Sequence, residues 1–177
     1  MNLFQFIARA AETARLPFLV IGAHAVNWYG YTRATIDVDI LVRKEDRGGW
    51  LALTAAEGFQ LFHDGEHFLQ LSPPYGISWP LDLMLVNDRT FRGLTTDSRD
   101  ATMCGAKVRV PSPEMLIALK LHVIKHGPPH RKGKDLQDIL GITEHTQLDL
   151  RSEKYRQIFE KHGTLELYEE VIRACES

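Results

Sequence analysis

The chain has 177 residues, of which 44% are hydrophobic and 25% are charged, and its formal net charge is -2. A chain of this length buries about 68 to 70% of its unfolded surface and by default forms one globular domain, while its slightly acidic charge excludes a global attraction to nucleic acid. Cys104 and Cys175 form no Cys-x-x-Cys pair, which argues against a structural zinc site. No stretch reaches the roughly eighteen apolar residues of a membrane span, so a soluble, cytoplasmic protein is expected.

The first part of the chain alternates predicted helices and strands. Amphipathic spacing predicts a helix over residues 2–14, and the apolar run from Phe18 to Gly22 predicts a buried strand that ends in glycine. The remaining elements expected here are helices over 23–29 and 44–57 and strands over 36–42, 59–62, 67–71, 81–86 and 107–110.

The last part of the chain is predicted to be helical. Ser112 and Pro113 are a typical helix start, with a serine cap followed by proline in the first turn. Helices are expected over 115–126, 135–143, 152–161 and 165–175. The pattern therefore predicts a core domain of residues 1–111 and a C-terminal helical segment of residues 112–177 packed on it.

The strand predicted over 36–42 carries two acids. Asp37 and Asp39 alternate with branched apolar residues, so both carboxylates project from one face of that strand. Asp82 lies in the same way on the polar face of the strand predicted over 81–86. Like charges that share a cleft repel each other unless a divalent ion with oxygen ligands neutralises them. The acids therefore predict a metal site.

Gly22 stands where the first strand should turn into a helix. The helix amides around Ala23 and His24 would form an anion site for phosphate groups. Two plainer interpretations remain open, because glycine is common in such turns for steric reasons and His24 fits the role of a helix cap.

Together these residues resemble the nucleotidyltransferase superfamily, whose pattern is a glycine turn, an Asp-x-Asp strand and a third acid. The likeness is strongest to the AbiEii-like branch of bacterial toxins and their small relatives, and it covers about residues 17–140. That branch also matches at Tyr29-Gly30, at Arg33 and at the helix that begins Lys134-Asp135-Leu-Gln-Asp138. The second glycine or serine of the family turn is Ala23 here, and no residue separates Tyr29 from Gly30.

The resemblance implies an α/β (α+β) nucleotidyltransferase fold, with a mixed twisted sheet flanked by helices and a C-terminal helical segment. It implies magnesium-dependent transfer of a nucleoside monophosphate from a nucleoside triphosphate such as ATP to a hydroxyl on RNA (tRNA included), a protein or a small molecule. A toxin role with an antitoxin partner is also implied. Asp37 and Asp39 would hold two magnesium ions, for which manganese substitutes, while Asp82 shares one ion and takes the acceptor proton. The residues implied in nucleotide binding are Gly22, Ala23, His24, Arg33, Lys120 and Lys134.

Two alternatives accompany this interpretation. His122 and His126 have the i, i+4 spacing of a helical zinc pair, but the glutamate that a metalloprotease needs is absent, so a zinc role is disfavoured. A catalytically silent nucleotide-binding or regulatory protein on the same fold remains open. Asp135 and Asp138 are expected to brace their helix instead of binding metal.

Overall fold

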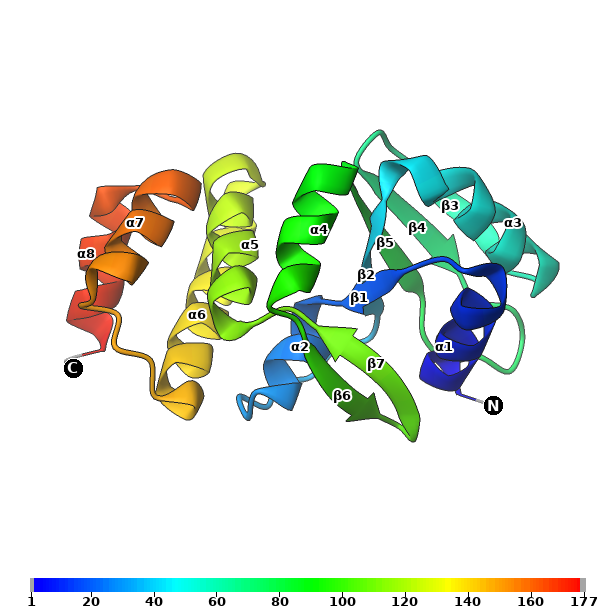
Figure 1. The fold of residues 1–177 in the computed structure, drawn as a ribbon, viewed down its shortest axis with the longest axis horizontal. Helices are drawn as coiled ribbons and strands as arrows, with labels where there is room; N and C mark the ends of the chain where they lie inside the picture. Colours follow the sequence, from blue (N-terminus) through cyan, green and yellow to red (C-terminus); the bar gives the residue numbers. More distant parts are fainter. Residues whose placement is uncertain (1, 176–177) are drawn as a thin grey trace. The chain divides into compact units, whose positions relative to one another are not determined.

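The computed structural model describes residues 2–175 (Figure 1). They form two compact units: unit 1 contains residues 2–25 together with 34–111, and unit 2 contains residues 26–33 together with 112–175. One division between the units falls after residue 111, and residues 26–33 cluster with the C-terminal helices. The assignment of residues 1–111 as a core domain and 112–177 as a C-terminal helical segment stays a prediction. The packing of the C-terminal segment on the core stays a prediction.

Unit 1 is built on a mixed five-stranded sheet in the order β1-β2-β5-β4-β3. Its strands are β1 (Phe18–Val20), β2 (Val38–Arg43), β3 (Gln60–Asp64), β4 (Phe68–Ser72) and β5 (Leu81–Val86). Its helices are α1 (Leu3–Ala14), the start of α2 (Gly22–Trp28), η1 (Lys44–Asp46), α3 (Arg47–Ala56) and α4 (Asp88–Thr96). β2 and β5 are parallel and the other neighbours in this sheet are antiparallel. The expected mixed sheet with flanking helices is confirmed.

The centre of this sheet is apolar because β2 and β5 alternate as the sequence indicated. Val38 and Ile40 of β2, and Leu81 and Leu83 of β5, are fully buried. Burial of such side chains stabilises a fold by about 1.5 to 3 kcal/mol each. The opposite face of the same strands is left for the acids.

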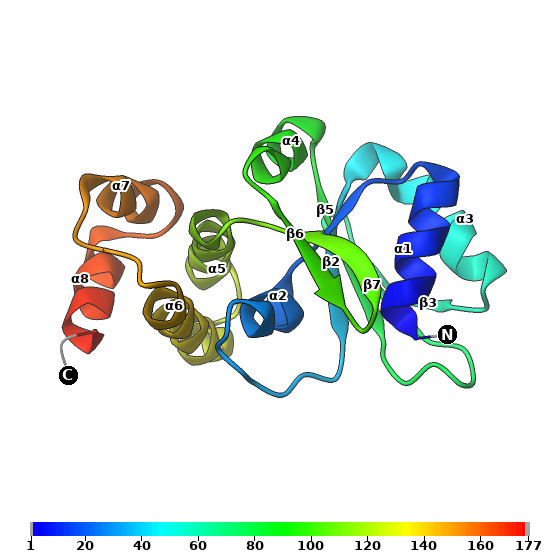
Figure 2. The ribbon, with the colours of Figure 1, turned by 60° about the horizontal axis from the view of Figure 1, so that its bottom comes forward.

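A separate two-stranded hairpin, β6 (Arg99–Met103) and β7 (Ala106–Val110), completes unit 1. β7 packs against α1, as the two views of the ribbon show (Figures 1 and 2). The sequence analysis predicted β7 but neither β6 nor α4. Both contain few apolar residues, since α4 buries only Phe91 and Leu94 and β6 only Ala101 and Met103, so neither stands out as an apolar segment in the sequence.

Unit 2 contains the C-terminal helices. They are α5 (Pro113–His126), η2 (Pro129–Arg131), α6 (Lys132–Thr146), α7 (Glu153–His162) and α8 (Leu165–Ala174). Ser112 caps α5 as predicted, because its hydroxyl accepts a hydrogen bond from the Met115 amide at 3.3 Å. Within this unit α5 contacts α6 and α7, and α7 contacts α8. None of the helices formed by residues 2–175 combines the length and the apolar character needed to cross a bilayer.

The segment 26–33 joins unit 2 through side chains that meet one face of α6. Asn27 holds the backbone of Arg33 from both sides, accepting from its amide at 2.9 Å and donating to its carbonyl at 3.0 Å. The Arg33 side chain pairs with Asp138, and the ring of Tyr31 lies so close to Gly141 that a Cβ at that glycine would overlap it. These contacts explain why the segment clusters with the C-terminal helices.

Candidate active site

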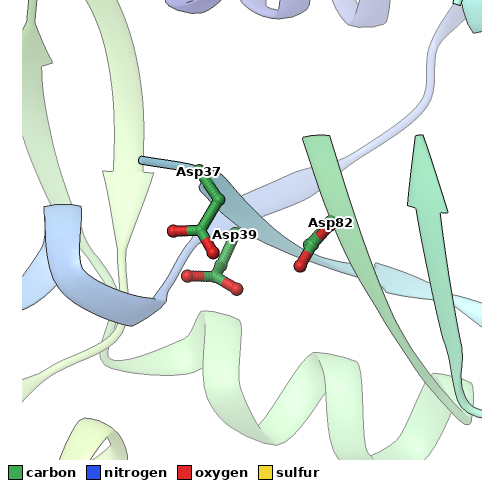
Figure 3. A group of neighbouring side chains, drawn as sticks. All are labelled: Asp37, Asp39 and Asp82. Atoms are coloured by element: carbon green, nitrogen blue, oxygen red, sulfur yellow. The ribbon is translucent and has the colours of Figure 1, made fainter. Parts of the chain in front are cut away.

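Asp37, Asp39 and Asp82 converge, as their positions in the sequence predicted (Figure 3). Asp39 and Asp82 are direct partners in the parallel register of β2 and β5, and Asp37 directly precedes β2. One carboxylate oxygen of each residue lies within 4.8 Å of the others. Asp37 and Asp39 are half-buried, whereas Asp82 is only 6% exposed.

This acidic cluster is electrostatically costly on its own. At separations of 4.8 Å or less, each pair of unit charges repels by about 3 kcal/mol or more at an effective dielectric constant near 20. Carboxylate oxygens are the ligands that hard divalent cations such as Mg²⁺ take in proteins. The donor set and its crowding therefore fit a divalent metal, as expected from the sequence.

Gly22 makes room for one of these carboxylates. Its φ of 63° lies in the left-handed region, and a Cβ built on it would overlap the carboxylate of Asp39. The Ile21 amide also donates to the Asp39 carbonyl at 3.0 Å. The sequence placed Gly22 in a turn between a strand and a helix. The structure adds that the Asp39 side chain approaches the Gly22 backbone too closely for any side chain at position 22.

Two polar neighbours orient the acids. Thr35 donates from its hydroxyl to Asp37 Oδ1 at 2.6 Å, and Gln70 donates from its amide to Asp82 Oδ2 at 3.2 Å. Sequence reasoning missed Gln70, which lies on β4 directly opposite Asp82. The sequence did show that Gln70 alternates with Leu69 and Leu71 and so points to the opposite face of its strand. It did not show that β4 pairs with β5, which is what brings Gln70 to Asp82.

The other residues predicted near this turn lie in α2. Ala23 is buried, while His24 is half-buried and has its ring 4.9 Å from that of Phe4 and 5.1 Å from that of Trp79, centroid to centroid. These contacts give the His24 side chain a packing role between α1 and the segment before β5. Nucleotide binding by Ala23 and His24 stays a prediction.

The remaining predicted binding residues lie in unit 2, and two of them are in a buried ion-pair network. Lys120 Nζ lies 2.6 Å from Asp138 Oδ2 and 2.9 Å from Asp135 Oδ1, and Arg33 Nε lies 2.7 Å from Asp138 Oδ1. The side chains of both aspartates are at most 1% exposed. The expectation that they brace their helix is thus confirmed. Lys134 is exposed at the start of α6.

The histidine pair shows no tight metal cluster. The rings of His122 and His126 are 4.6 Å apart between centroids on α5. Within residues 2–175, however, the only group of three or more metal-ligating side chains with closely spaced donor atoms is the three aspartates.

Solved structures of nucleotidyltransferases resemble this chain. The antibiotic-resistance factor ANT(2'')-Ia matches with a TM-score of 0.58 at 20% identity, covering 96% of this chain and 86% of that one. An antigenic nucleotidyltransferase-like protein from Paracoccidioides brasiliensis matches with a TM-score of 0.60 at 16% identity over 98% and 90%. The lincosamide antibiotic adenylyltransferase LnuA matches with a TM-score of 0.56 at 14% identity over 79% and 94%.

Comparison of the sequence found no match among family models or curated proteins. At identities of 20% or less the structural likeness shows the fold alone. The chain therefore has the nucleotidyltransferase fold that its motifs predicted.

Proposed function

We propose that the protein is a magnesium-dependent nucleotidyltransferase, which moves a nucleoside monophosphate from a nucleoside triphosphate to an acceptor hydroxyl. The observation that carries this proposal is the convergence of Asp37, Asp39 and Asp82, with ligand atoms within 4.8 Å, in a nucleotidyltransferase fold. Solved neighbours support it, since one is a complex of ANT(2'')-Ia with adenylyl-2''-tobramycin and another is LnuA bound to lincomycin.

In this proposal the three aspartates have different roles. Asp37 and Asp39 would hold two divalent cations, and Asp82 would be a further ligand of one of them. When bound, such ions would neutralise phosphate charge and stabilise the attacking and leaving oxygens. Asp82 takes the proton of the acceptor hydroxyl while the hydroxyl oxygen bonds to the α-phosphorus of the nucleotide. The bond between the α-phosphorus and the oxygen that bridges to the β-phosphorus breaks, which releases pyrophosphate. Gln70 and Thr35 hold Asp82 and Asp37 in the required orientation.

The triphosphate needs further positive groups. Three carboxylates and two Mg²⁺ ions sum to about +1, and a bound triphosphate brings about -4, so amides and basic side chains must supply the rest. We assign this role to the backbone at Gly22, Ala23 and His24, and to Lys134, which is exposed and has no ion-pair partner within residues 2–175. Arg33 and Lys120 also belong to the proposal, although Arg33 would first have to leave Asp138 and Lys120 would have to leave both Asp135 and Asp138.

The fold alone does not specify the acceptor or the biological role, so both are proposed from sequence motifs. The Arg33 and Lys134-to-Asp138 motifs support an AbiEii-like toxin that acts beside an antitoxin, with a hydroxyl of RNA, a protein or a small molecule as acceptor. Incubating a bacterial extract with the protein and each α-labelled triphosphate in turn would identify both the nucleotide and the acceptor. Label on RNA is released by ribonuclease, label on protein is released by protease, and label on a small molecule passes a desalting membrane.

The decisive test compares matched substitutions. Wild-type protein with Mg²⁺ should transfer label and release pyrophosphate, whereas Asp39→Asn should not. Asp97→Asn is the control, because Asp97 is an exposed aspartate at the end of α4 in the same unit. If Mg²⁺ and nucleotide raise the melting temperature but no condition yields pyrophosphate, the alternative of a silent nucleotide-binding protein replaces the proposal.

A further inference from the structure

A second feature of unit 1 lies apart from the acidic cluster. A groove of about 1160 Å³ runs between α1 and the β6–β7 hairpin, which lie beside each other in Figure 2. Gln5 and Arg9 of α1 line one wall, and Thr102 and Lys107 of the hairpin line the other. Arg43, at the end of β2, and residues of α4 also line it.

The groove is basic in a chain that is acidic as a whole. Its lining contains five basic residues and two acidic ones, an excess of three positive charges, whereas the chain carries -2. The basic residues are Arg9, Arg15, Arg43, Lys107 and Arg109, and the acidic ones are Glu12 and Asp100. A local basic patch of this kind attracts anionic ligands.

Three of these cations are available to a ligand. Arg43 is engaged by Asp46 at 2.6 Å and Arg109 lies 3.6 Å from Asp100. In contrast, Arg9, Arg15 and Lys107 are exposed, and no carboxylate of residues 2–175 lies within ion-pair distance of them. They come from two separate elements that face the same hollow, so a ligand that pairs with all of them must carry several negative charges.

We propose that this groove binds the phosphate backbone of single-stranded RNA. Arginine forks and the hydroxyl and amide groups of Thr102 and Gln5 suit phosphate oxygens. An acidic protein segment fits less well, because it would find few apolar anchors: of the apolar side chains in the lining only Pro17 is exposed, Ala8, Leu16 and Phe18 are half-buried, and the others are buried. A role of the bound RNA as the acceptor would rest on the proposed function, whereas the binding of RNA in the groove does not.

The number of free cations predicts the salt dependence of binding. For single strands the slope of log K against log salt is about -0.7 per phosphate neutralised, so three contacts give about -2 and a loss of about 20-fold between 50 and 200 mM salt. Replacing any one of Arg9, Arg15 or Lys107 by glutamine should reduce the slope by about 0.7. Arg89→Gln is the matched control, because Arg89 is exposed on α4 in the same unit but does not line the groove.

The test uses the full chain and a fluorescent twelve-nucleotide oligouridylate, without Mg²⁺ or triphosphate. Anisotropy titrations at several salt concentrations should show weaker binding and a shallower slope for Arg9→Gln and Lys107→Gln than for Arg89→Gln. Equal affinities for these three variants would overturn the proposal. Displacement of the RNA by polyglutamate at equal charge concentration would also overturn it, in favour of an acidic protein segment.

The two cysteines supply an independent readout in the same experiment. Cys104 is exposed in the hairpin turn beside Gly105, which lines the groove, and Cys175 is exposed at the end of α8. Bound RNA should slow the alkylation of Cys104 by iodoacetamide but leave Cys175 unchanged. No protection of Cys104 at saturating RNA would place the RNA elsewhere. Because nothing here requires transfer, an inactive protein that binds RNA in the groove would refute only the proposed function.

Discussion

Asp138 should be among the most sensitive positions for the stability of unit 2. Its carboxylate, which is 0% exposed, lies 2.6 Å from Lys120 Nζ and 2.7 Å from Arg33 Nε, and its Oδ2 accepts a hydrogen bond from Arg33 Nη2 at 3.2 Å. With Asp135 these groups form a neutral buried set of two cations and two carboxylates, and the exposed Arg131 lies 3.8 Å from Asp135 at its edge. Asp138→Asn keeps the size of the side chain but leaves one excess positive charge in a buried site.

The magnitude follows from burial. The side chains of Lys120 and Arg33 are only 7% and 15% exposed, so water can do little to solvate the unbalanced charge. Removing one partner of a buried ion pair costs about 3 to 5 kcal/mol. At about 2 to 4 °C per kcal/mol for a chain of this size, the melting temperature should fall by about 6 to 20 °C.

Thermal and urea unfolding would measure this loss. Glu160→Gln is the control, since it removes an exposed i, i+4 partner of Arg156 and should change stability by less than about 1 kcal/mol. Adding Lys120→Met to Asp138→Asn restores neutrality and should recover part of the loss. If Asp138→Asn costs no more than Glu160→Gln, the network does not stabilise the unit and the reasoning fails.

Three further predictions concern the acids, the glycine turn and the histidines. Without divalent ions, Asp39→Asn should keep or raise the melting temperature, because it relieves carboxylate repulsion. Mg²⁺ and nucleotide together should raise the melting temperature of the wild type but not that of Asp39→Asn. An equal rise in both proteins would contradict a metal role for Asp39. Gly22→Ala should abolish transfer, because a Cβ there overlaps Asp39 and φ is 63°; full activity would show that the turn relaxes freely. Burial lowers the pKa of both His122 and His162 from 6.5, with help from neighbouring positive charges. The unfolded chain therefore binds more protons, and stability present above about pH 6.5 should be lost as pH falls through the folded values. A pH series of melting temperatures should flatten in the double glutamine variant, and an unchanged slope would exclude these histidines as its cause.

The parts of the fold that follow from local pattern were predictable. The apolar run Leu81–Val86, interrupted only by Asp82, located β5 to the residue, and the two-residue period of strands placed Asp39 and Asp82 on the faces opposite the buried residues beside them. Their convergence required only that the two strands be neighbours, which the resemblance implied. α4 and β6 were missed because they are mostly polar and each buries only two residues, so neither stands out as an apolar segment.

Contacts between distant residues were not readable from the chain. Gln70 orients Asp82 only because β4 pairs with β5, and a strand pattern does not specify its partner. Likewise, Arg33 and Asp138 are 105 residues apart, so charge in the sequence could not show that this arginine is already neutralised by a carboxylate. The same contact moves residues 26–33 from the predicted core into unit 2.

Opposite responses to one chemical change distinguish the two groups of aspartates. Asp135 and Asp138 are balanced by cations that the chain itself supplies, so deleting one carboxylate creates an unbalanced buried charge. At Asp39 the carboxylates themselves crowd within 4.8 Å, and deleting one charge reduces their repulsion in the absence of metal. Aspartate-to-asparagine substitution should therefore destabilise at 138 and not at 39, with nucleotide transfer lost at 39. Destabilisation of similar size at both positions would mean that the cluster around Asp39 holds the fold together instead of binding metal.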